Sequence, residues 1–421
     1  MARPEQPPNG SAPLPNNRLC MPTRRELCAG AAVGIASLLT RNGVADTRKS
    51  DDLLAVHADM LYTVSGAPIK NGVVLMQAGK IAAVGSGLQI PSGVKTLRTA
   101  AAMPAMVDPH SYLGCFYEGA EPVDAITPDF RIADGFDPTD PMIARTVAAG
   151  VTTVAIMPGN TSVLGGQAAI LRLGGAADIV SRTAGQKVSA TEDAANPERN
   201  PTSRAGAIAL LRAALLGARS GQAVSSTTQT TTLAGYPTSF SERVDALRSL
   251  LLGHIRAYFH APGADDIENA LSVIDAFNLR AVLVHAAEGY AIADRIAAHR
   301  LPVILGPLGL ADADHTLSNA ALLSAAGAKV AFCSNSPLSQ PESLRLSAHI
   351  ASHYGLGRAS ALRAITLTGA EMIGVSSQVG SIEVGKEADL LLLSGDPLDL
   401  SSSIDGVVMR GRLQKEANHN A

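Results

Sequence analysis

The sequence predicts an α/β fold: a closed (β/α)8 barrel of the TIM type carrying a small β-sandwich built from both ends of the chain. Three observations predict it. Apolar runs alternate with Ala- and Leu-rich helical stretches through the middle of the chain, as in parallel βα units. Short alternating strands, separated by Gly, Pro and Asn, occur at both ends. Hydrophobic residues make up 46% of the 421 positions and charged residues 17%, which suffices for a large core.

The sandwich strands are expected within residues 51–101 and 372–415. Their spacing is too short for helical crossovers, so we expect the two ends to pair in one small domain. The predicted strands are Asp59–Val64, Gly72–Gln77, Lys80–Val84, Ala388–Leu393 and Gly406–Arg412.

The barrel is expected over residues 102–371, where eight apolar runs fit the eight strands of such a fold. These runs are Ala102–Val107, Thr152–Met157, Ala168–Leu173, Lys187–Ala190, Ala257–His260, Ala281–His285, Pro302–Leu305 and Lys329–Cys333. An open doubly wound sheet is the alternative, but no Gly-x-Gly-x-x-Gly motif follows the first run.

Residues 1–45 predict a leader with a twin-arginine export signal rather than part of the fold. Arg24 and Arg25 precede the apolar run Leu27–Leu39, and small residues such as Ala45 follow it. The alternative is a buried amphipathic helix, although the run has no polar face. The signal predicts an exported, periplasmic protein.

Composition limits the partners. The 34 basic and 37 acidic residues give a net charge of −3 without a long Lys/Arg run, which argues against nucleic acid. The sequence contains no stretch of about 18 apolar residues, so no integral membrane span is expected. Two of the four cysteines, Cys115 and Cys333, lie beyond the signal, and small buried hydrophobes are a better interpretation of them than a disulfide. Neither nucleic acid nor an integral membrane span is therefore expected.

Polar residues recur where the predicted strands end, which is where a parallel barrel carries its chemistry. They are His110 after the first strand, Lys187 at the start of the fourth, His260 ending the fifth, His285 ending the sixth and Asn335 after the eighth. The loops at this end converge, so we expect these side chains to meet.

Four sequence blocks carry a resemblance to a known family. They are GKIAAVG at 79–85, MPAMVDPHSYLG at 103–114, GVTTVAIMPG at 150–159 and VGSIEVGKEADLLLLSGDP at 379–397. With them the chain resembles the amidohydrolase superfamily, in its imidazolonepropionase-like branch. The resemblance implies a barrel with a sandwich from both chain ends, and metal-dependent hydrolysis of a C–N bond in a small-molecule substrate.

The resemblance also implies a set of metal ligands, two of which are altered here. The family pattern has His-x-His after strand one, a carboxylatable Lys on strand four, a His each on strands five and six, and an Asp after strand eight. These positions fall on His110, Tyr112, Lys187, His260, His285 and Asn335. A phenol with a pKa of about 10 is a poor ligand at neutral pH, and the Asn335 amide cannot act as the general base. The resemblance therefore predicts a degenerate centre with about one zinc, held by His260, His285 and carboxylated Lys187.

Other residues are candidates for proton transfer or substrate binding. Glu288 and the Asp265–Asp266 pair are candidate proton carriers or supporting carboxylates. The backbone at Gly165 and Gly166 presents either N–H groups for an anionic substrate or a plain turn. Arg199 and Arg204 either clamp a substrate carboxylate or are solvated loop charges.

The function expected from the sequence is metal-dependent hydrolysis of a cyclic-amide-type C–N bond by a protein with an impaired metal centre. The alternative is a catalytically inactive homologue that acts as a binding or partner subunit, as a homo-oligomer or with an active homologue. Tyr112 and Asn335 motivate this alternative.

Overall fold

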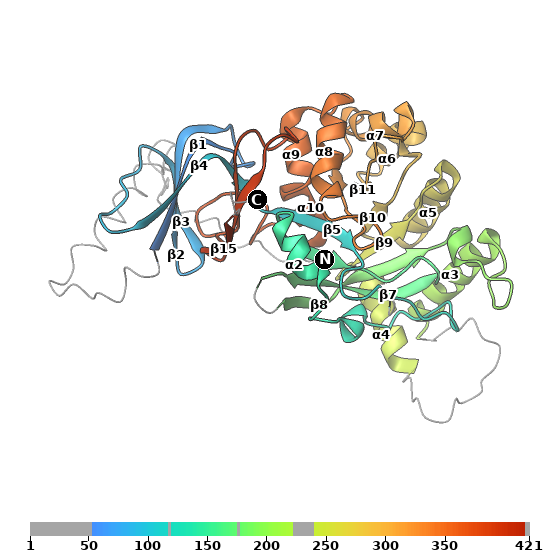
Figure 1. Ribbon diagram of the computed structural model, residues 1–421. Helices are drawn as coiled ribbons and strands as arrows, with labels where there is room; N and C mark the ends of the chain where they lie inside the picture. Colours follow the sequence, from blue (N-terminus) through green and yellow to red (C-terminus); the bar gives the residue numbers. More distant parts are fainter. Residues whose placement is uncertain (1–52, 117–118, 175–176, 222–239, 417–421) are drawn as a thin grey trace, which may run out of the picture. The chain divides into compact units, whose positions relative to one another are not determined.

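The computed structural model describes residues 53–116, 119–174, 177–221 and 240–416. The predicted export signal lies outside the described residues. Eight strands form the larger sheet in the order β12-β11-β10-β9-β8-β7-β6-β5. Helices α5 to α9 lie outside strands β9 to β11 (Figure 1). The strands are β5 Met106–Ser111, β6 Val151–Ile156, β7 Leu164–Arg172, β8 Asp178–Ser189, β9 Arg256–His260, β10 Ala281–Val284, β11 Val303–Leu305 and β12 Val330–Phe332. The helices are α2 Met142–Ala148, α3 Arg204–Arg219, α4 Phe240–Leu251, α5 Ala264–Phe277, α6 Ala293–Ala298, α7 Asp314–Ala325, α8 Ser343–His353, α9 Arg358–Ala364 and α10 Leu367–Ile373.

The larger sheet nearly closes into a barrel, so the predicted fold class is confirmed. Across the seam between β5 and the chain after β12, Tyr112 N donates to the Ser336 carbonyl at 2.7 Å. The Ser111 hydroxyl donates to the same carbonyl at 3.0 Å. Hydrogen bonds beyond the regular strands thus hold the first and last strand ends together, next to the predicted site.

One strand departs from the parallel pattern. β7 pairs antiparallel with both β6 and β8, whereas the remaining neighbours in the sheet are parallel. Antiparallel neighbours need no helical crossover, and no helix lies between β6 and β8 among the described residues. The expectation of βα units throughout is therefore wrong for this hairpin. The predicted strand Lys187–Ala190 covers only the end of β8, and the predicted first strand Ala102–Val107 is divided between β4 Lys95–Pro104 of the smaller sheet and β5.

The barrel interior is apolar at one end and polar at the other. Along β9, Tyr258 faces an interior cluster that includes Val282 and Ile304, while Phe259 packs against the outer helices. Residues of α10 join the interior cluster, and the Tyr258 hydroxyl donates to the Met372 carbonyl at 3.1 Å. Because strand side chains alternate, His260 follows Tyr258 on the inner side, nearer the open end.

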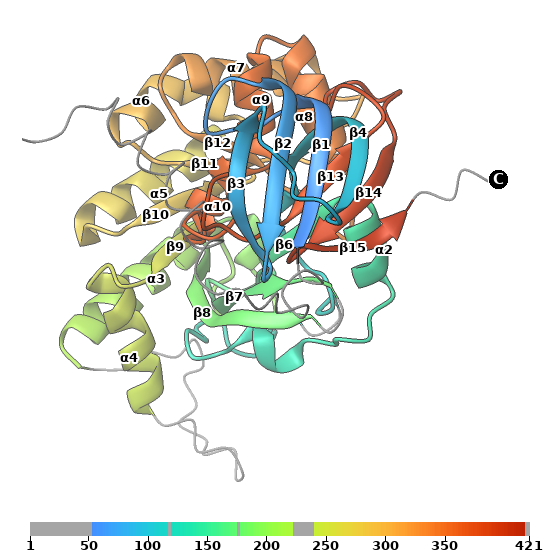
Figure 2. The same ribbon diagram turned by 90° about the vertical axis from the view of Figure 1, so that its left-hand side faces the viewer.

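The smaller sheet is built from both ends of the described chain, as predicted, in the order β15-β14-β13-β4-β1-β2-β3. Figure 2 shows β1 to β4 side by side with β13 and β14. The sheet curls over a core of its own, and Ile81 N on β3 donates to the Lys386 carbonyl at 2.9 Å. Its strands are β1 Leu53–Leu61, β2 Ile69–Gln77, β3 Lys80–Ser86, β4 Lys95–Pro104, β13 Leu390–Leu393, β14 Ile404–Met409 and β15 Arg412–Glu416.

A buried ion pair joins the two sheets. Arg172 on β7 lies 2.5 Å from Asp389, which directly precedes β13, and both side chains are about 5% exposed. Asp389 also accepts from the Thr152 hydroxyl at 3.3 Å and from Arg410 N at 2.8 Å. Removing one member would leave a buried charge without its main partner.

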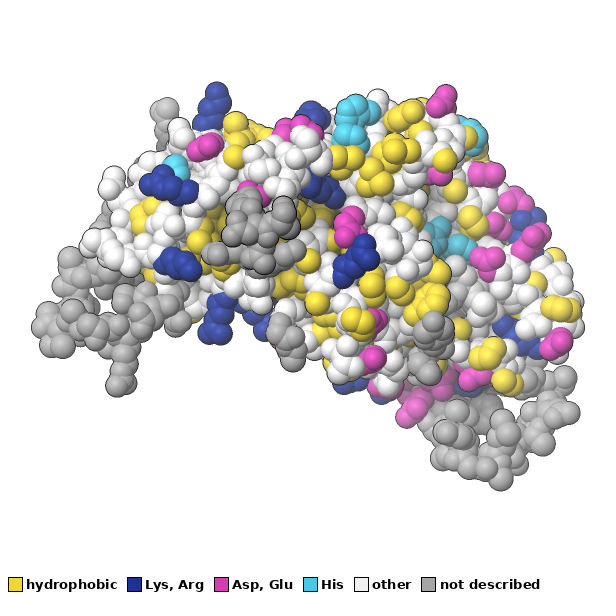
Figure 3. Space-filling view, in the orientation of Figure 1, with side chains coloured by type: hydrophobic (Ala, Val, Ile, Leu, Met, Phe, Trp, Pro, Cys, Tyr) yellow, Lys and Arg dark blue, Asp and Glu magenta, His cyan; other side chains and the backbone are white. Residues whose placement is uncertain are grey.

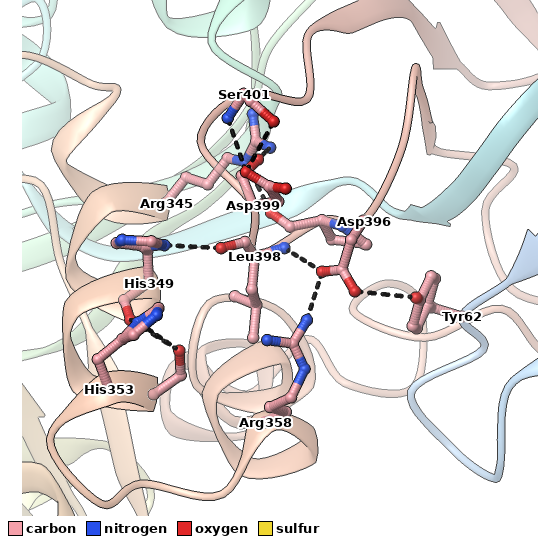
Figure 4. A network of polar contacts seen from close by, with 11 residues as sticks. Tyr62, Arg345, His349, His353, Arg358, Asp396, Leu398, Asp399 and Ser401 are labelled. Atoms are coloured by element: carbon pink, nitrogen blue, oxygen red, sulfur yellow. Dashed lines mark hydrogen bonds and ion pairs between the residues drawn. The ribbon is translucent and has the colours of Figure 1, made fainter.

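The loop 394–403 is anchored to the barrel helices by a polar network (Figure 4). Arg345 on α8 donates to three loop carbonyls, those of Pro397, Asp399 and Ser402, at 2.7–2.8 Å. Arg358 on α9 pairs with Asp396 at 2.5 Å, and the Tyr62 hydroxyl donates to Asp396 at 3.4 Å. These bonds fix the return of the chain to the smaller sheet.

The surface has no continuous basic field on the face seen in Figure 3, where Lys and Arg side chains are scattered among apolar and uncharged ones. Within the described part of the chain, none of the helices has the length and apolarity needed to cross a membrane.

Candidate active site

Five polar side chains meet inside the barrel at the ends of its strands. His110 lies on β5, Lys187 on β8 and His260 at the end of β9, while His285 follows β10 and Asn335 follows β12. The structure thus brings together the four residues that the sequence placed at strand ends and Lys187. The sequence placed Lys187 at the start of a strand, whereas it lies near the end of β8. We call this set the polar cluster.

A chain of short contacts links the polar cluster. Lys187 Nζ lies 2.9 Å from His110 Nε2, and His110 Nδ1 lies 2.9 Å from Asn335 Oδ1. The same amide oxygen lies 2.9 Å from His285 Nε2. His285 Nδ1 in turn lies 3.1 Å from His260 Nδ1. His285 therefore contacts the cluster through both ring nitrogens.

Two members of the cluster have an uncommon backbone conformation. His285 and Asn335 have positive φ angles of 59° and 54°. Such angles are rare for non-glycine residues and concentrate at functional sites. The loop after β10 is held by Asn319 on α7, whose amide donates to the Ala286 and Ala287 carbonyls at 2.9 Å each. This tether supports the conformation that turns His285 into the barrel.

Burial favours the uncharged forms of the cluster, the imidazoles most strongly. It lowers the pKa of Lys187 to about 7, and burial followed by the nearby Lys187 charge lowers the pKa of His260 and His285 to about 3. The same two causes hold the pKa of His110 well below its usual value. Neutral imidazole is the form that binds metals.

The donor set fits a first-row divalent metal. His110, His285 and Cys333 each offer a ligand atom, and these atoms lie within 4.8 Å of one another. Imidazole nitrogen and cysteine sulfur are common zinc ligands. Cys333 is completely buried, as the sequence predicted for a small hydrophobe, but its thiol lies among these donors.

Tyr112, at the altered position, lies beside the cluster. Its ring meets that of His110 edge to face with centroids 5.1 Å apart. Burial raises the pKa of its phenol, so the hydroxyl stays protonated. The side chain also lines a pocket of about 250 Å³ together with Phe116, Ala120, Pro122, Thr161 and Leu338, among others. Tyr112 thus separates the polar cluster from a largely apolar pocket.

Two aspartates at the site were not singled out from the sequence. Asp193, after β8, places Oδ2 2.8 Å from His260 Nε2 and is about half exposed. Asp108 is buried and accepts from His110 N and from Ser334 N at 3.2 Å each. Burial raises the pKa of Asp108 to about 7. The position of Asp108, two residues before His110, could have indicated from the sequence that it lies near the site. The contact of Asp193 with His260 depends on a loop conformation and could not.

The carboxylates proposed from the sequence as proton carriers are engaged elsewhere. Glu288 accepts from Ala264 N at 2.9 Å. Asp265 and Asp266 both pair with Arg204. Neither contact involves the polar cluster, so Asp193 is the better-placed carboxylate.

The remaining predicted substrate-binding residues lie in different surroundings. Gly165 lies beside Lys187, whose Cγ would be 3.7 Å from an added Cβ. Gly166 has a φ of 101°, and an added Cβ would come within 2.5 Å of the Phe130 carbonyl, so this glycine is required for close packing. Arg199 donates to the carbonyl of Thr161, which lines the pocket. The Arg204 guanidinium is instead committed to its ion pairs.

Known proteins resemble this chain over most of its length. The model of the Amidohydrolase family matches residues 101–414. A solved amidohydrolase from Thermotoga maritima MSB8 is 27% identical, with a TM-score of 0.76, over 86% of this chain and 100% of that one. Ochratoxinase from A. niger, 15% identical over 87% of this chain and 96% of that one, shares the fold with a TM-score of 0.52.

A curated relative, amidohydrolase tasK of Hapsidospora irregularis, is 26% identical over 340 residues, which are 70% of this chain and 33% of that protein. The chain spans about a third of the length of that relative. With the family model matching well over half of its residues, the chain belongs to the amidohydrolase family.

Proposed function

We propose that this protein is a metal-dependent hydrolase of C–N bonds of the cyclic-amide type, related in chemistry to the imidazolonepropionase-like branch. The observation that carries the proposal is the position of His285, whose two ring nitrogens face His260 on one side and the Asn335 oxygen on the other. His110 and Lys187 complete the group around it. Neutral nitrogen donors gathered in a buried pocket are what a catalytic zinc requires.

We assign metal binding and proton transfer to different residues of the chain. When bound, a zinc ion polarises the scissile carbonyl and activates water. His285, with His110, Lys187 and His260 around it, holds and orients the ion. Asp193, whose carboxylate is about half exposed, would take the place of the missing general base by accepting the proton directly, and its contact with His260 Nε2 would orient that ring. Asn335 contributes a neutral oxygen and cannot move a proton.

The pocket beside Tyr112 supports a substrate with an apolar group next to the reacting bond. Its lining includes Phe116, Pro122 and Leu338, and a volume of about 250 Å³ suits a small organic substituent. The Tyr112 hydroxyl provides a hydrogen-bond partner at the boundary with the cluster. Cyclic amides and dipeptide-like compounds with one apolar side are the substrates to screen.

A second candidate is a catalytically inactive binding or partner subunit. Two observations favour it: Asn335 lacks a basic oxygen, and its amide oxygen is already shared by His110 and His285. Converting Tyr112→His and Asn335→Asp together distinguishes the two candidates. Hydrolysis that appears only in the double variant would exclude a working enzyme in the native chain.

Metal content tests the proposal first. Elemental analysis of the full chain purified without chelator is expected to give about one zinc per chain. His285→Ala is expected to lose it, whereas the control His299→Ala is not, because His299 contacts Asp275 and Arg295 instead. A native chain without metal contradicts the proposal.

We also propose that the protein is exported to the periplasm, on the basis of the paired Arg24 and Arg25 before the apolar run. Cell fractionation is expected to find it there, and Arg24→Lys with Arg25→Lys is expected to retain it in the cytoplasm. Equal distribution of both forms contradicts the proposal.

A further inference from the structure

Three potential ligand atoms converge on a single oxygen. Asn335 Oδ1 lies 2.9 Å from His110 Nδ1, 2.9 Å from His285 Nε2 and 3.4 Å from Cys333 Sγ. An amide oxygen has two lone pairs, which the two imidazole N–H groups can fill, so the thiol hydrogen is left to the Gly306 carbonyl. The same two imidazoles and the sulfur are potential metal ligands grouped around one position.

The Cys333 thiol is a weak donor and makes two hydrogen-bond contacts. Besides Asn335 Oδ1, it lies 3.6 Å from the Gly306 carbonyl. Cys333 is completely buried, and alternation along β12 places it on the inner side with Ala331. The thiol therefore points to the same interior space as the polar cluster.

We propose that Cys333 is a metal ligand and that its thiolate, with His110 Nδ1 and His285 Nε2, forms a His2Cys site for zinc. The site rests on the metal dependence proposed above and specifies which face of the cluster holds the ion. On binding, the thiol loses its proton to solvent as the sulfur–metal bond forms. Asn335 Oδ1 provides a neutral fourth ligand or yields that position to water.

Charge balance supports the assignment. An Asn in place of Asp at position 335 removes one negative charge from the centre, and an anionic ligand stabilises a buried divalent ion more than a further neutral one does. The Cys333 thiolate restores one negative charge two residues away along the chain. His110 Nε2 then contacts Lys187, and His285 Nδ1 contacts His260, as outer partners that orient the two rings.

The geometry requires only local adjustment. Zinc bonds of about 2.0–2.1 Å to nitrogen and about 2.3 Å to sulfur put tetrahedral ligands roughly 3.3–3.6 Å apart. The three atoms already lie within 4.8 Å of one another. Side-chain rotations of about 1 Å bring them to ligand distance.

Cobalt substitution tests the thiolate directly. The full chain carrying Cys20→Ser and Cys28→Ser is treated with chelator and reconstituted with Co²⁺. We expect a near-ultraviolet sulfur-to-cobalt charge-transfer band that persists in the control Cys115→Ser and disappears in Cys333→Ser. We expect Cys333→Ser to weaken zinc binding by more than the roughly 10–100-fold that loss of an outer partner costs.

X-ray absorption of the native zinc protein gives an answer even if Cys333→Ser does not fold. One sulfur neighbour at about 2.3 Å is expected. Bound metal with nitrogen and oxygen neighbours alone would overturn the Cys333 assignment and leave the proposed hydrolase intact. A native chain that binds neither Co²⁺ nor zinc would overturn both.

Discussion

In the metal-free protein, the substitution Lys187→Met should raise the free energy of unfolding at neutral pH and lower it at alkaline pH. Lys187 is fully buried, and burial lowers its pKa from 10.5 to about 7. The unfolded chain therefore takes up a proton more readily than the folded chain between these values. The free energy of unfolding is reduced most at and below pH 7, rises with pH, and recovers fully above about pH 10.5.

The size of the effect follows from the two pKa values. Each factor of ten in proton affinity corresponds to about 1.4 kcal/mol, so the reduction at pH 7 is about 5 kcal/mol. Met has a similar length and no charge, and it removes this cost. The substitution also leaves His110 Nε2 without its partner at 2.9 Å, which costs about 1–3 kcal/mol. Lys187→Met should therefore stabilise the protein by about 2–4 kcal/mol at pH 7 and destabilise it by about 1–3 kcal/mol near pH 10.5.

Urea denaturation of chelator-treated protein at several pH values measures both effects. Lys70→Met is the matched control, because Lys70 is exposed on β2. The control should follow the native pH dependence. If Lys187→Met also follows it, or is less stable than the native chain at pH 7, the lowered pKa of Lys187 is refuted.

Three further outcomes are expected. Asp193→Asn should lower turnover by about 10²–10⁴-fold with zinc content unchanged, because it removes the carboxylate that contacts His260. If a substrate assay gives equal turnover for the variant and the native chain, Asp193 is not the base. Asp389→Ala should lower the free energy of unfolding by about 3 kcal/mol, because Arg172 stays buried without its closest partner. Adding Arg172→Met to the same chain should restore much of the lost stability. If urea denaturation shows no recovery, the ion-pair explanation is wrong. Zinc at about 100 times its dissociation constant should raise the free energy of unfolding by about 2.7 kcal/mol, and calorimetry should show no such rise in His285→Ala.

The strand-end positions were predictable because they depend on strand register alone. A polar residue at the end of an apolar run in a parallel barrel faces the open end, whatever the loops do. His110, His260, His285 and Asn335 could therefore be placed together from their spacing. Lys187 stood at the start of its predicted strand and was placed with them by the family resemblance, because β8 begins at Asp178, well before the predicted start. The pairing of both chain ends was predictable for a similar reason, since neither set of short strands forms a sheet of sufficient size alone.

The antiparallel course of β7 and the role of Asp193 were not predictable in the same way. An apolar run has the same pattern in either strand direction, and direction is set by whether a helix or a short turn follows. Asp193 reaches His260 through the turn after β8, and turn conformation is not encoded in hydrophobic periodicity. Cys333 looked like an ordinary small hydrophobe because burial and ligand position are indistinguishable until the neighbouring donors are known.

The burial of the polar cluster constrains the choice between an active enzyme and an inactive subunit. A barrel of this type is normally filled with branched apolar side chains, and replacing buried polar groups with apolar ones of equal volume is often neutral or stabilising. Lys187, His110 and Cys333 are completely buried here and contact mainly one another or Asn335. Packing alone does not call for these groups, so a subunit that serves only as a scaffold gives no physical reason for them. A bound metal therefore explains these buried groups under both hypotheses, the active hydrolase and the inactive subunit. The two differ in the proton carrier, because the hydrolase needs Asp193 or another base in place of Asn335, whereas the inactive subunit does not.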